Sequence, residues 1–394
     1  MRQWCVGVLC VMTVFCAVPA GAQSVGAPLP PWQQGTLDIH LINTGRGDAA
    51  LLVLPDGTSL QFDAGDDGFP PESPRSVPVP MTSGPAGERI GRYVSRVLQP
   101  FRTPEIDYAL VSHLHRDHIA AMPDLARVVP IRKLLDRGWP EYAPGPAPAQ
   151  TGIDYYLDFA KATPGRMERF EAGRADQITL RRAPADYPSF VVRNIAVNGQ
   201  VWTGAGTATR SRFPDNWQAL SGIHLPTENQ SSLGIRVSYG AFDFYTGGDL
   251  PGLLRPGAPG WQDIETAVAQ AVGPVEVAVA NHHGVRDSTN PFFVSTLQPR
   301  LWLLQVWAVD HPAHDTVDRM LSRDLYPGDR DILATNFGEA NRPVIGPMVD
   351  RITSTRGHIV IRVDKGGATY RAFVLEDTDE SMRVKASYGP YTSR

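Results

Sequence analysis

Cysteine is scarce in this chain of 394 residues, and its three cysteines, Cys5, Cys10 and Cys16, all lie within the first 22 positions. If that segment is removed, the remaining chain has neither a thiol nor a disulfide. Cysteine nucleophiles, cysteine metal ligands and a disulfide framework are thereby excluded. Any metal centre would have to be built from histidine and carboxylate side chains.

Residues 1–22 have the features of a secretory signal peptide. A single charge, Arg2, precedes an apolar run over residues 4–18, and small residues at 20–22 form a cleavage site. An uncleaved membrane anchor is the alternative, although the apolar run is short for a transmembrane span. We therefore expect a periplasmic or secreted protein that has no stable membrane insertion after cleavage.

A strong excess of charge is also lacking. The formal net charge is −4 and there is no long run of Lys or Arg, so nucleic acid is not favoured as a partner by charge. A small-molecule or phosphodiester substrate remains open. About 370 residues follow the signal segment, which is enough for a large core. We expect a linker over 23–35, a main domain over 36–375 with an insertion at about 135–200, and a polar tail over 376–394.

The stretch IDYALVSHLHRDHIAAMPDL, which begins at Ile106, joins an apolar run to a cluster of polar side chains. The apolar run predicts a buried strand. His113 and His115 follow it, two positions apart, and project to the same side of an extended segment. Asp117 and His118 lie on the next turn, where they can face a second ion. Imidazole and carboxylate are ligands for zinc, iron and manganese, so the segment predicts a metal centre.

The pattern H-x-H-x-D-H after an apolar strand resembles the signature of the metallo-β-lactamase fold superfamily. That resemblance implies a mixed α/β fold, the four-layer αββα sandwich. The alternating run at 37–41, the hairpin that turns at 55–57 and the D-A-G motif containing Asp63 resemble the opening of this fold. In that family the aspartate of this motif is usually structural, so Asp63 is not a predicted ligand. The role of Asp48 is left open.

Two later strand ends supply the remaining predicted ligands. Asp249 follows two glycines at the end of an aromatic strand, where the resemblance implies a carboxylate that bridges two ions. A carboxylate suits that role because each of its oxygens can bind one cation. A second strand, at 275–280, ends in N-H-H-G. The resemblance implies a final histidine ligand there, and we expect His282, with His283 as its substitute or as a proton donor.

One branch of the superfamily resembles this chain most. Most hydrolytic members have a further histidine ligand before the bridging aspartate, but His224 is the only histidine in that interval here. The segment N-Q-S-S that starts at Asn229, the T-G-G-D and V-A-N-H-H-G strand ends and a later His-Pro resemble the hydrolase domain of the competence protein ComEC and its stand-alone relatives. The resemblance spans about 37–325. It departs at 120–121, where two alanines replace the usual glycines.

The expected activity is metal-dependent hydrolysis, with two zinc ions and with manganese or iron as alternatives. A water activated between the ions would attack a phosphodiester, the substrate that the ComEC-like resemblance favours. His311 would contact a phosphate oxygen or protonate the leaving group, unless it is only fixed in a turn by the next proline. The first ion would be completed by Asn229, His224 or water. The predicted ligands are His113 and His115 for one ion, Asp117, His118 and His282 for the other, and Asp249 between them.

Two other functions stay open. Export, acidic charge and an aromatic-rich insertion favour a lactone or β-lactam as the substrate of the same site. A non-catalytic exported binding protein that retains the fold is the second alternative. We expect substrate choice to be set by residues 127–228, because loops around a fixed metal site carry specificity.

Overall fold

The computed structural model describes residues 25–66, 68, 73–75, 84–142 and 153–394. The predicted signal peptide at 1–22 lies outside the described residues, so its cleavage stays a prediction. Among the helices of the described residues, none is long and apolar enough to cross a membrane.

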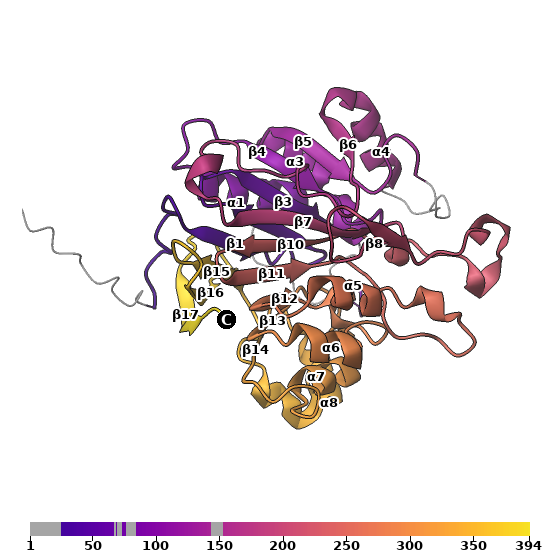
Figure 1. Ribbon diagram of the computed structural model, residues 1–394. Helices are drawn as coiled ribbons and strands as arrows, with labels where there is room; N and C mark the ends of the chain where they lie inside the picture. The colour runs from indigo at the N-terminus through magenta and orange to yellow at the C-terminus, as the bar shows by residue number, and fades with distance from the viewer. Residues whose placement is uncertain (1–24, 67, 69–72, 76–83, 143–152) are drawn as a thin grey trace, which may run out of the picture.

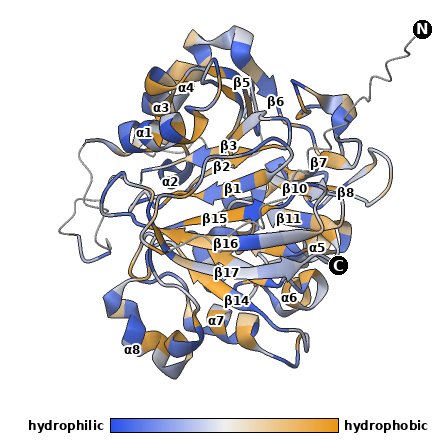
Figure 2. Ribbon diagram, turned by 90° about the vertical axis from the view of Figure 1, so that its left-hand side faces the viewer, coloured by the Kyte–Doolittle hydropathy of each residue, from blue (hydrophilic) through white to orange (hydrophobic). Residues whose placement is uncertain are grey.

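The first of two large sheets has nine strands in the order β17-β16-β15-β1-β2-β3-β4-β5-β6. Figure 2 shows most of these strands side by side. Pairing is antiparallel from β17 to β3 and parallel from β3 to β6. The predicted strand at 37–41 and the hairpin turning at 55–57 are confirmed. The strands are β1 (Leu37–Leu41), β2 (Ala49–Val53), β3 (Ser59–Ala64), β4 (Ile106–Leu110), β5 (Ile131–Asp136), β6 (Met167–Arg169), β15 (His358–Val363), β16 (Thr369–Leu375) and β17 (Val384–Thr392).

The second sheet has eight strands in the order β14-β13-β12-β11-β10-β7-β8-β9. Its strands β11 to β14 run parallel, whereas β11, β10, β7, β8 and β9 pair antiparallel. The strands are β7 (Phe190–Val197), β8 (Gln200–Trp202), β9 (Thr209–Ser211), β10 (Gly234–Tyr239), β11 (Phe242–Thr246), β12 (Val277–Val279), β13 (Leu301–Leu304) and β14 (Asp331–Ala334).

The two sheets pack face to face over one apolar core. Alternate residues of a strand point to opposite faces, so Leu37, Ile39 and Leu41 of β1 enter this core. Ile235 and Val237 of β10 enter it from the other sheet. All five side chains are fully buried. The alternation visible in the sequence therefore defines the inner faces of a sandwich.

Helices cover the outer face of each sheet (Figure 1). This arrangement is the four-layer αββα sandwich, as predicted. The α-helices over the first sheet are α1 (Ala86–Leu98), α2 (Arg116–Ile119), α3 (Met122–Val128) and α4 (Ile153–Ala162), and those over the second are α5 (Glu265–Val272), α6 (Pro291–Leu297), α7 (His314–Leu321) and α8 (Arg342–Ile345). The 3-10 helices are η1 (Pro164–Arg166), η2 (Pro184–Asp186), η3 (Trp217–Ala219), η4 (Gly222–His224), η5 (Asn229–Ser231), η6 (Gly260–Gln262), η7 (Asn281–Gly284), η8 (Glu339–Asn341) and η9 (Gly346–Arg351).

Helix α1 shows how sequence periodicity places a helix on its sheet. Ile90, Val94 and Val97 recur at helical spacing and are buried against the outer face of the first sheet. Burial of each such side chain contributes roughly 1.5–3 kcal/mol. His40 of β1 points to this outer face, where its Nδ1 lies 2.9 Å from the hydroxyl of Tyr93. His40 is therefore a packing residue, as its place on the strand predicts.

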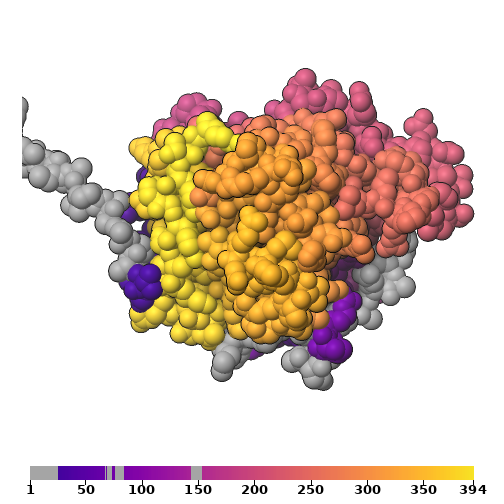
Figure 3. Space-filling model, turned by 90° about the horizontal axis from the view of Figure 1, so that it is seen from below, coloured from indigo at the N-terminus to yellow at the C-terminus, as the bar shows by residue number. Residues whose placement is uncertain are grey.

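The C-terminal residues, expected as a polar tail, include a strand. Val384–Thr392 form β17, which pairs antiparallel with β16, for example Ala372 with Tyr388. Tyr388 and Tyr391 also donate hydrogen bonds from their hydroxyls to the Thr353 carbonyl and the Asp331 carboxylate. Figure 3 shows the end of the chain, in yellow, lying against neighbouring segments on this face of the molecule. Polar composition here reflects an edge strand that has one exposed face.

The segment expected as an insertion also contains part of the core. Phe190–Val197 form β7, which pairs with β10 over six positions inside the second sheet. Val192 is buried between the sheets. This strand therefore belongs to the sandwich, and the other limits of the predicted domain stay predictions.

Candidate metal centre

The predicted cluster lies where β4 ends and α2 begins. His113 is fully buried, and its Nε2 lies 3.0 Å from Nδ1 of His115. His115 keeps an extended backbone as the residue before α2, so both imidazoles face the same side, as predicted. Asp117 and His118 follow within the first turn of α2, where Asp117 Oδ2 lies 3.6 Å from His118 Nε2.

Asp249 stands between two groups of side chains, one at each of its carboxylate oxygens. Oδ1 lies 3.2 Å from His118 Nε2 and 3.6 Å from His283 Nε2. Oδ2 lies 3.6 Å from His113 Nε2 and 3.6 Å from His282 Nε2. A carboxylate in this position can bind one cation with each oxygen.

The strand end that carries Asp249 packs closely against residues that follow β4 of the first sheet. Gly248 has a φ of +56°, and a Cβ there would lie 2.7 Å from Cβ of Ser112. Only glycine fits this left-handed, crowded position without strain. The Ser112 carbonyl in turn accepts a hydrogen bond from Leu233 N of the second sheet. The centre therefore lies at one end of the sandwich, between the sheets.

His282 and His283 both point into the centre because the backbone turns sharply after β12. Their φ values are +48° and +54°, in the left-handed region that non-glycine residues rarely adopt. His283 Nε2 lies 3.0 Å from Asp117 Oδ2. We expected His282 beside Asp117, but His283 occupies that place and His282 lies at the opposite oxygen of Asp249. That expectation rested on the resemblance, whereas two successive left-handed residues turn both imidazoles into the centre and place the alternative, His283, beside Asp117.

Asp249 belongs to two groups of potential metal ligands, one of four residues and one of three. The first group is Asp117, His118, His283 and Asp249, and the second is His113, His115 and Asp249, with the potential ligand atoms of each group within 4.8 Å of one another. His282 adds a nitrogen at the edge of the second group, because its Nε2 lies 3.6 Å from Asp249 Oδ2. The same Nε2 lies 3.2 Å from Nδ2 of Asn229. His224 is exposed on η4 and belongs to neither group of the described residues.

Acceptor groups behind the imidazoles fix which ring nitrogen faces the centre. His118 Nδ1 lies 2.8 Å from Asp63 Oδ2, and His282 Nδ1 lies 2.7 Å from Asp287 Oδ1. In each case Nδ1 carries the proton, which leaves the lone pair of Nε2 turned toward Asp249. Carboxylate-supported imidazoles of this kind are typical of metal sites. Asp63 is thus a supporting residue, as the resemblance implies.

His283 is held by a similar arrangement. Its Nδ1 lies 3.1 Å from Oδ1 of Asp48 and 3.2 Å from the carbonyl oxygen of Gln305. Both are acceptors, so Nδ1 carries a proton and Nε2 faces Asp117. Asp48, whose role the sequence left open, therefore supports His283 at its Nδ1. Asp287 was not predicted from the sequence, although its place five residues after the candidate ligand His282 could have indicated it.

Electrostatics within the centre favour a cation. Burial alone raises the pKa of Asp249, but the surrounding histidines outweigh it and hold that pKa well below its usual range. Burial disfavours charge on His118, yet the three carboxylates around it raise its pKa well above the ordinary value. The buried carboxylates therefore require positive charge among the imidazoles.

Several polar atoms of the centre fit a bound metal. His118 Nε2, Asp249 Oδ1 and Asn229 Oδ1 are buried and have no hydrogen-bond partner among the described residues. His118 Nε2 and Asp249 Oδ1 face each other at 3.2 Å. Two acceptors at this distance need a proton or a metal ion between them, since unpaired buried polar atoms are costly. Imidazole and carboxylate donors suit zinc, manganese and iron.

His311 lies beside the centre rather than at its surface. It is 3 % exposed, and its ring stacks on that of His283 with centroids 4.8 Å apart and an interplanar angle of 8°. Trp307 meets both rings edge-on. This packing fixes the position of His283. The predicted contact of His311 with substrate stays a prediction.

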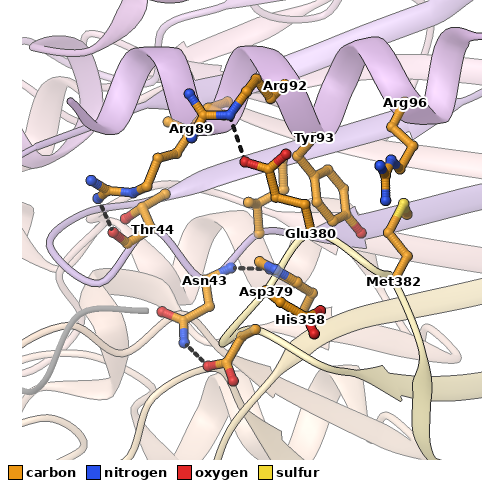
Figure 4. A pocket seen from close by; sticks show the side chains of 13 residues that line it. Asn43, Thr44, Arg89, Arg92, Tyr93, Arg96, His358, Asp379, Glu380 and Met382 are labelled. Atoms are coloured by element: carbon orange, nitrogen blue, oxygen red, sulfur yellow. Dashed lines mark hydrogen bonds and ion pairs between the residues drawn. The ribbon is translucent and has the colours of Figure 1, made fainter. Parts of the chain in front are cut away.

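A separate cavity lies between α1 and the loops at 43–44 and 377–382 (Figure 4). Two of its arginines contact groups of the two loops. Arg92 contacts Glu380 at 2.5 Å, and Arg89 donates to the Thr44 carbonyl at 2.8 Å. His358, which also lines the cavity, accepts a hydrogen bond from a backbone N–H. We assign this cavity a structural role.

Comparison with known proteins adds no family assignment. No protein-family model matches the chain, and no curated protein matches it. Among solved structures it is similar to a mutant of CmlA beta-hydroxylase, with 13% identity, a TM-score of 0.40 and coverage of 78% of this chain and 54% of that one. It is also similar to MEM-A1, a subclass B3 metallo-beta-lactamase from a soil metagenome library, with 12% identity, a TM-score of 0.33 and coverage of 64% and 80%. The chain spans about half the length of the CmlA protein.

Proposed function

We propose that this protein is a metal-dependent hydrolase that binds two cations, one at each oxygen of Asp249. The division of histidines between those oxygens carries the proposal. The two sets of ligands share Asp249: His113, His115 and His282 would hold the first cation with Asn229 beside them, and Asp117, His118 and His283 would hold the second.

The protein side chains position the reactants. Asp63 and Asp287 orient two of the imidazoles, and His311 packs behind a third. Bound divalent cations would lower the pKa of a water molecule and polarise the bond under attack. Zinc suits these donors, and manganese or iron would also be accepted.

Two substrate classes are proposed. A phosphodiester is favoured by the ComEC-like resemblance of the segment at Asn229, whose Nδ2 lies 3.2 Å from His282 Nε2. A carboxylic ester, lactone or β-lactam is favoured by a different observation, the apolar cavity that opens beside His115 and His282. Export to a periplasm or to the medium remains part of the proposal.

The first test combines metal content with turnover. Metal-free protein would be loaded with zinc or manganese, and bound metal per chain measured with hydrolysis of bis(p-nitrophenyl) phosphate, p-nitrophenyl butyrate and a chromogenic β-lactam. Wild type is expected to bind two ions and to turn over at least one substrate. Asp117→Ala and Asp249→Ala should abolish turnover, whereas Asp215→Ala, at an exposed position, should not. Metal binding without turnover of any substrate, or unchanged turnover in Asp249→Ala, would contradict the assignment.

A further inference from the structure

A large groove opens directly beside the candidate metal centre. Its volume is about 910 Å³, within the range of small-molecule binding sites. His115 and His282 line one end of it, and both belong to the side of the centre at Asp249 Oδ2. A molecule in the groove would therefore reach the imidazoles directly.

Two loop segments form the walls of this groove, residues 222–230 and 251–262. Figure 1 shows both regions, in pink to salmon, extending on the right-hand side of the sandwich. Gln262 ties the walls together, because its Nε2 donates to the Ile223 carbonyl at 2.7 Å. The groove is thus formed jointly by both segments.

The second wall is also tied to the metal centre. The backbone N–H groups of Gly252 and Leu253 both donate to the Asp287 carbonyl at 2.8 Å. The side chain of Asp287 holds His282. One residue therefore contacts both the wall and an imidazole, which links the groove to the centre.

The walls are unusually apolar for an exposed surface. Ile223, Leu225 and Leu254 are 55%, 37% and 41% exposed, and all three line the groove. Exposed apolar side chains that gather at one site are typical of interaction surfaces, and a concave site of this volume suits a small molecule. Leu253, Pro226, Pro251 and Ala258 extend the same lining.

Charge within the groove is sparse. Glu228 is buried and paired with Arg137, and the carboxylate of Asp287 contacts His282. Arg255 is the single Lys or Arg side chain among the lining residues. A polynucleotide would need several cations to neutralise its phosphates. The lining therefore matches an apolar ligand that carries at most one negative charge.

We propose that this groove binds the apolar alkyl or aryl part of a small-molecule substrate, whose hydrolysable bond lies at the His115–His282 end. The inference rests on the proposed hydrolase function for the chemistry at that end. It names the substrate class: a small apolar ester-type compound rather than a nucleic acid strand.

Binding can be tested without turnover. Metal-loaded protein would be titrated with anilinonaphthalene sulfonate, an apolar monoanion whose fluorescence rises in apolar sites. Wild type should bind one probe per chain, displaced by octanoate far better than by acetate and not by a short oligothymidylate. The double variant Ile223→Ser/Leu254→Ser should bind the probe at least about tenfold more weakly. Val344→Ser, at an equally exposed apolar residue of α8, serves as the control, and unfolding curves confirm that each variant is folded.

Turnover supplies a second measurement. Alkyl p-nitrophenyl phosphodiesters and p-nitrophenyl carboxylic esters, each from methyl to octyl, would be compared. For the bond type that is hydrolysed, kcat/KM should rise roughly two- to fourfold per added methylene, and this rise should be lost in the double variant. Equal probe binding in wild type and double variant, displacement by the oligonucleotide but not by octanoate, or turnover independent of chain length would overturn the groove assignment. Specific probe binding with no turnover of either series or of the chromogenic β-lactam would leave the groove supported and remove the hydrolase function.

Discussion

The carboxylate of Glu228 accepts two hydrogen bonds from the guanidinium of Arg137, each 2.6 Å long. Both side chains are almost fully buried. Glu228 Oε1 also accepts a hydrogen bond from Leu114 N at 2.8 Å. Because Leu114 lies between His113 and His115, this buried ion pair fixes the turn that carries both imidazoles.

Glu228→Gln should destabilise the protein by about 3 kcal/mol or more, because it removes the carboxylate that neutralises the buried Arg137 guanidinium. The free energy of unfolding in urea measures this loss. Affinity for the first cation should also fall about tenfold or more, as for other groups that orient ligands. Glu105→Gln is the matched control, since Glu105 pairs with the exposed Arg132, and should cost less than about 1 kcal/mol. Equal stability of both variants would contradict the role given to Glu228.

Separate alanine variants of His282 and His283 should each remove a different cation. Bound zinc per chain, measured by equilibrium dialysis, should fall from two to one in both. Adding His113→Ala to His282→Ala should cause no further loss, because both residues face the same oxygen of Asp249. Adding His118→Ala to His282→Ala should abolish binding. His314→Ala, at an exposed histidine, should still bind two ions. The reverse pattern in the double variants would show that the two histidines are assigned to the wrong sides.

Gly65→Ala should disrupt the metal centre by displacing the backbone of Asp117. A Cβ at this position would lie 1.6 Å from the carbonyl oxygen of Asp117, so the backbone of α2 would have to move. We expect a loss of about 3 kcal/mol or more in the free energy of unfolding, together with weaker metal binding. Gly165→Ala is the control, because a Cβ there has no atom within 4 Å, and should change stability by less than about 0.5 kcal/mol. A fully stable Gly65→Ala protein would rule out the close approach described here.

His358 should make folding sensitive to acid. Its Nδ1 accepts a hydrogen bond from Asn43 N at 3.0 Å, and burial lowers its pKa to about 4. The unfolded chain has the ordinary pKa of about 6.5. The folded state therefore binds this proton less readily, so the contribution is complete above about pH 6.5 and is lost as the pH falls toward about 4. The free energy of unfolding should lose about 3 kcal/mol from this group over that pH interval.

Urea unfolding between about pH 7 and pH 4 tests this expectation. His358→Gln, which keeps a polar side chain but cannot titrate, should lose less stability over that interval than wild type. His314→Gln should follow wild type. Parallel curves for wild type and His358→Gln would exclude His358 as the source of the acid sensitivity.

The fold could be predicted where strands alternate or end in a chemically distinctive motif. β1, the β2–β3 hairpin, β4 and β11 follow from apolar or aromatic runs and turn residues. β17 could not, because an edge strand with one exposed face has a polar sequence. β7 was not predicted, because the Pro- and Gly-rich segments around it favoured an irregular insertion. Pairing partners far apart in sequence stabilise both strands, and a local pattern does not contain that information.

The sequence predicted which residue types form the candidate centre and which strand ends carry them. His113, His115, Asp117, His118 and Asp249 come together as expected. The choice between His282 and His283 was not predictable, because it depends on two left-handed backbone conformations that no side-chain spacing encodes. Supporting contacts such as that of Asp287 with His282 also depend on the path of the chain after η7.

The bridging place of Asp249 has a consequence for stability. Its neighbours come from the ends of strands in both sheets: His113 and His115 follow β4 in the first sheet, whereas His282 and His283 follow β12 in the second. Each proposed cation would therefore join the two halves of the sandwich as a removable crosslink. Because only the folded chain assembles both sets of ligands, the melting temperature should rise with the logarithm of the free metal concentration and fall on chelation.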